Sequence, residues 1–252
     1  MNEITLPIAT PPWTANGRYL ESRVRKAVHD FDLLENKEHI AVALSGGKDS
    51  LTLLYLLNAL SGRGFPPFKI TAIHIGGEFS CGASIHLDFI QSVCGSLNIP
   101  LIVREEDTPP TECYSCSRRR RTLLFEEARR VGADIVAFGH HRDDCIQTLL
   151  MNLLHKGEFE GNLPKVPMFD YGITIIRPLI YISEKEIIEF AKHYGFYRIT
   201  CQCPIGQNSV RKKTEEFIKQ LEHTFPHARK NLAHASLHQG SQKAKENPHA
   251  KR

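Results

Sequence analysis

Apolar residues along the chain fall into two patterns: short continuous runs, and longer segments in which they recur every three or four residues. The runs predict five β-strands, at 39–44, 69–75, 100–103, 134–138 and 173–176. The longer segments predict helices at 17–34, 49–61, 84–97, 117–131 and 143–155, and a capping-box pattern opens another at Ser183. This alternation predicts an α/β fold, with a parallel five-stranded sheet and helices on both faces.

Composition limits the number of domains. A chain of 252 residues with 41% hydrophobic content can bury one core and a small appended element. We expect a Pro-rich, extended lead-in at 1–16, one α/β domain at 17–215 and a helical C-terminal extension at 216–234. The polar residues 235–252 have little to bury and predict a disordered tail.

The segment 45–50 reads Ser-Gly-Gly-Lys-Asp-Ser and lies between the first predicted strand and a helix. Unpaired N–H groups and partial positive charge at a helix N-terminus favour a polyphosphate. Gly46 and Gly47 let the backbone approach the phosphate closely, and Ser45 and Ser50 can donate hydrogen bonds. A glycine-rich turn without a ligand is the alternative. The order of strand, glycines, cation and hydroxyls favours a nucleotide site.

This glycine loop (45–50) differs from the Walker A motif G-x-x-x-x-G-K-[ST]. Val42 stands where that motif needs its first glycine, and Asp49 stands where it needs Ser or Thr. A carboxylate in a phosphate site makes sense when it holds Mg²⁺ or a water on the metal. The loop resembles the PP-loop of N-type ATP pyrophosphatases. That resemblance implies cleavage of ATP between its α- and β-phosphates, with transfer of AMP to a substrate oxygen.

Ligands of parallel sheets bind at the carboxyl ends of the strands, so we expect the loops after residues 44, 75, 103 and 138 to meet. Gly-His-His-Arg-Asp-Asp at 139–144 follows the fourth predicted strand. Its carboxylates can bind Mg²⁺ or cap the next helix, and its imidazoles can contact phosphate or orient substrate. We add four residues to the candidate nucleotide-binding residues of the glycine loop. They are His74, Gly139, His140 and Asp144.

Seven cysteines are an odd number, and the chain does not look like a secreted disulfide scaffold. Cys113 and Cys116 form a C-x-x-C pair, which can serve as a redox dithiol, as half of a zinc site or in an iron–sulfur cluster. Cys201 and Cys203 could complete four zinc ligands, although C-x-C suits one tetrahedral ion less well. Three cysteines would leave one iron of a [4Fe–4S] cluster open for chemistry. We interpret Cys81, Cys94 and Cys145 as buried thiols.

Charge and hydropathy indicate which kinds of ligand and environment the chain suits. The net charge is +4, but four arginines run consecutively at 118–121, and Arg211-Lys212-Lys213 follows the second cysteine pair. Most such runs are solvated helix faces, yet arginine beside a cysteine pair suits the phosphates of ATP or RNA. No stretch approaches the roughly 20 apolar residues of a membrane span, and the N-terminus lacks a signal-peptide pattern. We therefore expect a cytoplasmic protein.

Several motifs in order resemble those of tRNA 2-thiocytidine synthetases within the PP-loop family, over about residues 17–215. The matching segments are 45–50, Cys-Tyr-Ser-Cys-Ser-Arg at 113–118, Gly-His-His-Arg-Asp-Asp at 139–144, Arg177-Pro178-Leu179 and Cys203-x-x-x-x-Asn208-x-x-Arg211. The resemblance implies an adenine nucleotide alpha hydrolase-like fold. It also implies an enzyme that adenylates the C2 oxygen of cytidine 32 in the tRNA anticodon loop and replaces it with sulfur.

The same resemblance implies cofactors, partners and roles. ATP and Mg²⁺ act at the glycine loop, with Asp49 as a magnesium ligand. Cys113, Cys116 and Cys203 hold a [4Fe–4S] cluster, and with Lys48 and Asp49 they form the catalytic set. The partners are tRNA and a sulfur donor such as a cysteine desulfurase, and a homodimer is compatible with this interpretation.

The late cysteine pair departs from the family's usual C-x-x-C. Counting back from Asn208 and Arg211 aligns Cys203 with the ligand and leaves Cys201 one position out of step. Two alternatives stay open. One is another PP-loop enzyme, for 2-thiouridine or lysidine synthesis or of the amidotransferase type. The other is a non-catalytic ATP-binding domain with a structural zinc site.

Overall fold

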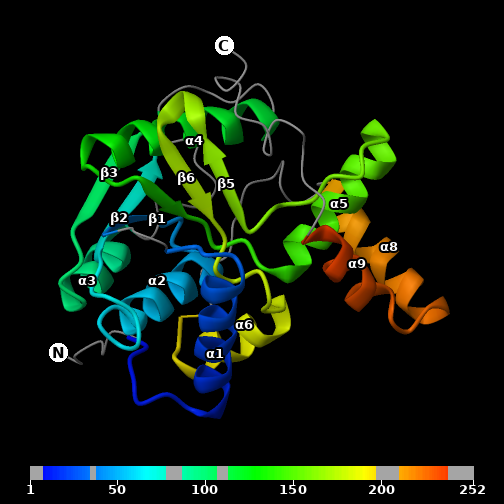
Figure 1. Cartoon of the computed structure of the whole chain (residues 1–252), viewed down its shortest axis with the longest axis horizontal. Helices are drawn as coiled ribbons and strands as arrows, with labels where there is room; N and C mark the ends of the chain where they lie inside the picture. The colour runs from blue at the N-terminus through cyan, green and yellow to red at the C-terminus, as the bar shows by residue number, and fades with distance from the viewer. Residues whose placement is uncertain (1–7, 35–37, 78–86, 107–112, 197–209, 238–252) are drawn as a thin grey trace.

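The computed structural model describes residues 8–34, 38–77, 87–106, 113–196 and 210–237, and a single sheet organises them (Figure 1). Its strand order is β3-β2-β1-β4-β6-β5. The strands are β1 His39–Ala43, β2 Lys69–Gly76, β3 Leu101–Glu105, β4 Ile135–Ala137, β5 Lys165–Met168 and β6 Ile173–Ile176. All neighbours pair in parallel except β5, which runs antiparallel to β6. The predicted α/β fold is confirmed.

One strand was missed by the sequence prediction. Strand β5 has only four residues, and Pro167 lies within it, opposite Thr174 of β6. Proline cannot donate a ladder hydrogen bond and therefore argues against a central strand. Because β5 forms the edge of the sheet, the proline is tolerated there.

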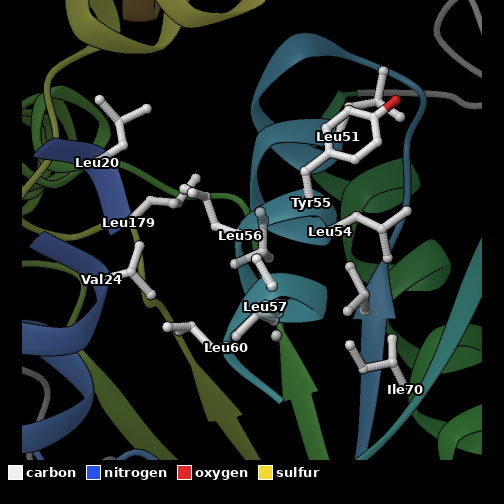
Figure 2. Packing of buried hydrophobic residues seen from close by; sticks show 14 of the residues in the cluster. Leu20, Val24, Leu51, Leu54, Tyr55, Leu56, Leu57, Leu60, Ile70 and Leu179 are labelled. Carbon is white, nitrogen blue, oxygen red and sulfur yellow. The ribbon is translucent and has the colours of Figure 1, made fainter. Parts of the chain in front are cut away.

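The sheet is covered on both faces. Alternate residues of β1 enter different cores, Ile40 and Val42 on one face and Ala41 on the other. The first core contains helices α1 Ala15–Asp30, α2 Lys48–Leu60, α3 Leu87–Ser96 and α6 Glu184–His193. In Figure 2, Leu20 and Val24 of α1, together with Leu179, approach Leu56, Leu57 and Leu60 of α2. Ten of the thirteen residues of α2 are buried, which fixes the start of this helix against the sheet.

Helix α4, Cys113–Arg130, covers the opposite face through Leu124, Phe125 and Ala128. It begins four residues before the predicted start at Ser117. The prediction that Cys113 and Cys116 precede this helix was wrong, because both lie in the first turn of α4. No apolar periodicity marks that turn, whereas the arginines that follow are good helix formers, so the helix extends beyond its apolar part.

Three helices form a lobe beside the sheet, to the right in Figure 1. They are α5 Arg142–Lys156, α8 Val210–Thr224 and α9 Ala228–Ser236, and their small core contains Ile146, Leu150, Ile218 and Ala233. The predicted helical C-terminal extension is thus present. The segment boundaries at 16, 215 and 234 stay a prediction, and residues 1–7 and 238–252 lie outside the described part of the chain. None of the described helices is long and apolar enough to cross a membrane.

Candidate active site

The glycine loop joins β1 to α2 and leaves the helix N-terminus open. Gly46 adopts φ +82°, and a Cβ at this position would lie 2.9 Å from Cδ1 of Ile90. Gly47 is the N-cap of α2 and, having no side chain, caps none of its N–H groups. Ser50 Oγ donates to the Gly47 carbonyl at 3.0 Å and lies 3.1 Å from Ser45 Oγ. The loop is therefore shaped by its own serines, with backbone N–H groups available for an anion.

Gly139 lies against the same helix start. A Cβ at residue 139 would lie 2.9 Å from the carbonyl carbon of Asp49 and 3.0 Å from the backbone nitrogen of Ser50. Both contacts are with backbone, so a flexible side chain cannot simply move aside. The glycine after β4 thus sets how closely the loop at 139–144 approaches the glycine loop.

We expect Gly139→Ala to weaken ATP binding by about tenfold, because the N–H groups of α2 would shift away from the phosphates. Calorimetric titration with ATP measures this. Gly95→Ala is the matched control, since a Cβ at Gly95 meets nothing within 4 Å. Equal ATP affinity in the wild type and Gly139→Ala would contradict the expectation.

Lys48 lies between two carboxylates. Its Nζ is 3.1 Å from Oδ2 of Asp49 and 3.0 Å from Oε1 of Glu184. Burial alone would lower the pKa of Lys48, but the two carboxylates outweigh it and raise the pKa above its usual value. The side chain is therefore an ammonium at the mouth of the glycine loop.

Asp49 has one oxygen without a partner. Its Oδ1 is buried and accepts no hydrogen bond from the described residues, and His141 Nε2 is 3.8 Å away. Burial raises the pKa of Asp49, although His141 and Lys48 act in the opposite direction. An unpartnered carboxylate oxygen beside a phosphate site suits Mg²⁺, which prefers a few carboxylate ligands completed by phosphate and water. Among the described residues, no three His, Cys, Asp or Glu side chains group as a complete metal site.

The loop at 139–144 caps α5 with a histidine. His141 is the N-cap residue; its Nδ1 accepts from the backbone N–H of Asp144, whose carboxylate accepts from the N–H of His141. His141 Nε2 then lies 3.4 Å from Oδ2 of Asp144, on the side of Asp49. Capping therefore explains Asp144 in part, and the same carboxylate also accepts from Arg211 of α8. Burial would raise the pKa of Asp144, but the nearby His141 and Arg211 lower it.

His140 is held by a buried arginine. Arg177 Nε donates to His140 Nδ1 at 3.3 Å, and the His140 ring stacks on Phe138 at a centroid distance of 5.5 Å. Arg177 also donates to the carbonyl of Leu163. Burial, and then the charge of Arg177, lower the pKa of His140 to about 3. The imidazole is therefore neutral, with Nε2 carrying the proton.

This neutral histidine predicts a pH dependence of stability. The folded pKa of His140 lies below the unfolded value of 6.5, so the unfolded chain binds the proton first as the pH falls. We expect the unfolding free energy to fall from pH 6.5 towards pH 5, with His140 contributing up to about 1.4 kcal/mol per pH unit. Urea unfolding at pH 7, 6 and 5 tests this. His140→Asn keeps an acceptor for Arg177 and should show the flatter dependence; parallel curves would contradict the expectation.

His74 is buried beneath the glycine loop. Its Nδ1–H donates to the carbonyl of Leu44 at 2.7 Å and so ties the end of β2 to the end of β1. Burial lowers the pKa of His74, with the Leu44 hydrogen bond acting in the opposite direction. The structure thus gives His74 a role in supporting the loop, and its contact with nucleotide stays a prediction.

Two of the arginines at 118–121 make hydrogen bonds to neighbouring segments, and another is exposed to solvent. Arg120 Nη2 donates to the carbonyl of Ile75 at 2.6 Å, and Arg119 Nε donates to Glu106 at 2.6 Å. These bonds join α4 to the carboxyl end of β2 and to Glu106, which follows β3. Arg118 is exposed.

The cysteines fall into two groups. Cys94 and Cys145 are buried free thiols, as predicted, and burial raises their pKa values to about 11 and about 12. The side chains of Cys113 and Cys116 lie outside the described part, as do Cys81, Cys201 and Cys203 entirely. The cluster ligands therefore stay a prediction.

Three further residues of the site were missed as such by sequence reasoning. Glu184 was noted only as part of a capping box, and Arg177 only as part of a motif at the end of a strand. Arg229 of α9 was not considered, yet its Nη1 donates to Asp143 Oδ1 at 2.6 Å. The contacts of these three residues with Lys48, His140 and Asp143 join segments far apart in sequence. The local sequence pattern therefore gave no indication of them.

Comparison with known proteins shows the family of this chain. The family model described as a PP-loop domain matches residues 18–199, and the chain belongs to that family. It is also 34% identical to the tRNA-cytidine(32) 2-sulfurtransferase of Geobacter metallireducens, over 86% of this chain and 88% of that protein. The corresponding enzyme of Dechloromonas aromatica is 34% identical, over 83% and 76%. Within the PP-loop proteins, the chain therefore belongs to the tRNA-cytidine(32) 2-sulfurtransferase family.

A solved structure supports the fold. The U34-tRNA thiolase NcsA of Methanococcus maripaludis, solved with its [4Fe-4S] cluster, superposes with a TM-score of 0.72. The alignment covers 88% of this chain and 77% of the thiolase at 24% identity. At this identity the likeness concerns the arrangement of strands and helices.

Proposed function

We propose that the protein is an ATP-dependent tRNA sulfurtransferase. It adenylates the C2 oxygen of cytidine 32 in the anticodon loop and replaces that oxygen with sulfur, giving 2-thiocytidine. The observation that carries the proposal is the pairing of Lys48 with Asp49 at the open N-terminus of α2, in a chain of this family. Helix α4, whose first turn contains Cys113 and Cys116, is joined to the end of β2 by the hydrogen bond from Arg120 to the Ile75 carbonyl, which supports the proposal.

The residues of the glycine loop account for the activation step. A carbonyl oxygen is a poor leaving group, and AMP attached to it becomes a good one. Lys48 and the N–H groups of α2 bind the departing pyrophosphate and stabilise its charge. Asp49 would hold Mg²⁺, which adds charge neutralisation on the phosphates. A single-stranded loop base suits this site, because the enzyme must reach the edge of the ring.

The cysteines account for the second step. Cys113, Cys116 and Cys203 would hold a [4Fe–4S] cluster, whose open iron supplies a place for the incoming sulfur. The exposed Arg118 and the arginine-rich start of α4 suit tRNA phosphates beside this position. A sulfur donor such as a cysteine desulfurase would complete the cycle in the cytoplasm, and a homodimer is the oligomeric state we propose.

Nucleoside analysis of tRNA tests the function. Deletion of the gene should remove 2-thiocytidine, and a plasmid-borne copy should restore it. Unchanged 2-thiocytidine would overturn the proposal. Anaerobic purification separates the alternatives, because a colourless, iron-free protein that still modifies tRNA would eliminate the cluster.

A further inference from the structure

We propose that Glu184 is a positioning residue for Lys48. Its carboxylate keeps the ammonium in place before nucleotide binds and then competes with the phosphates for it. This inference rests on the proposed function to the extent that a nucleotide binds the glycine loop.

Glu184 and Lys48 form a direct, partly buried ion pair. Glu184 Oε1 lies 3.0 Å from Lys48 Nζ, and the exposed fractions of the two side chains are 44% and 17%. An ammonium this sheltered is costly without a partner. Glu184 therefore stabilises Lys48 in the free protein, and its own exposure lets it return to water when a phosphate takes its place.

The position of Glu184 is set by the neighbouring helix start. Its backbone N–H donates to Asp143 Oδ2 at 2.7 Å, and the N–H of Arg142 donates to the carbonyl of Ile182 at 2.9 Å. Asp143 is in turn held by Arg229. These bonds fix the backbone of Glu184 beside the glycine loop, within reach of Lys48.

The charges decide the direction of the effect. Lys48 carries one positive charge, whereas Asp49 and Glu184 each carry a negative charge, and a polyphosphate brings several more. Mg²⁺ can neutralise Asp49, but it does not release Lys48 from Glu184. Nucleotide binding therefore brings a phosphate into competition with Glu184 for Lys48, and removing the Glu184 charge should favour the bound state.

Glu184→Gln tests this competition between Glu184 and phosphate. Glutamine keeps the side-chain length and the backbone N–H but loses the charge. We expect ATP and pyrophosphate to bind about two- to fivefold tighter than to the wild type, with adenosine unchanged. Calorimetric titration of the three ligands measures the effect. Glu189→Gln is the matched control, with the same charge change on the same helix at an exposed position that contacts Asn16.

The three ligands separate a positioning role from a structural one. Glu184→Gln binding all three ligands more weakly, or all three as the wild type does, would overturn the inference. Glu184→Asp keeps the charge on a shorter side chain and should give a smaller shift of the same sign. Wild-type protein that binds neither ATP nor pyrophosphate would overturn the proposed function as well. If the wild type binds both and Glu184→Gln changes nothing, only the inference falls.

Discussion

Cys203→Ser is expected to reduce 2-thiocytidine in tRNA by more than about 100-fold, since even partners of metal ligands cost 10- to 100-fold. A serine hydroxyl does not supply the thiolate that holds iron. Cys203 does not belong to the glycine loop, so ATP binding should stay at the wild-type level. Nucleoside analysis in a deletion strain carrying the variant measures the first effect, and calorimetric titration with ATP measures the second.

The chain provides its own control two residues away. Cys201→Ser removes a thiol from the same C-x-C segment and should leave 2-thiocytidine unchanged, because spacing from Asn208 and Arg211 aligns Cys203 with the ligand. Iron content and the visible absorbance of anaerobically purified protein should follow the same division. Loss of thiolation in Cys201→Ser with activity retained in Cys203→Ser would reverse the assignment.

Arg229→Gln is expected to destabilise the protein by about 3 kcal/mol. Arg229 contacts Asp143, Glu215 and Glu222, at 2.6, 2.7 and 3.0 Å. Burial would lower its pKa, but these carboxylates raise the pKa well above its usual value. The side chain of Asp143 is only 6% exposed, so removal of the arginine leaves a buried carboxylate short of charge compensation. Urea unfolding measures the free energy, and the midpoint of thermal unfolding should fall by about 6–12 °C.

Lys230→Gln is the control for Arg229, with the same charge change at the next, exposed residue of α9. The double variant Asp143→Asn with Arg229→Gln should recover part of the loss, because it removes the uncompensated carboxylate. Equal stability of Arg229→Gln and Lys230→Gln would contradict the role given to this contact.

Local pattern was sufficient for most of the fold. Five strands and the helices between them follow from apolar runs and intervals, and the glycine loop follows from its position between β1 and α2. The errors occur where local pattern is weak. Strand β5 carries Pro167, and the first turn of α4 carries cysteines and polar residues without periodicity. Both are stabilised by neighbours, one by β6 and the other by the helix that continues from it.

The candidate site divides in the same way. The glycine loop was predictable, because glycines, a lysine and an aspartate between a strand and a helix indicate a phosphate site by local pattern alone, whereas the cysteine ligands stay a prediction. The contacts between segments far apart in sequence were not predictable. His140 and Arg177 are 37 positions apart, Asp144 and Arg211 are 67 apart, and Asp143 and Arg229 are 86 apart. A charged side chain has many partners of opposite sign in the sequence, and only packing selects one.

The sequence by itself determined the α/β order of elements and the position of the glycine loop, because these are properties of short segments, and it predicts the cysteines proposed for thiolation. The tertiary structure alone decided that Glu184 pairs with Lys48, that Asp49 keeps a free oxygen, and that Arg229 holds Asp143. The physical reason is the separation along the sequence over which each kind of interaction acts. Helical and strand periodicity act within a few residues, whereas ion pairs and burial depend on distances that exist only once the helices have packed on the sheet.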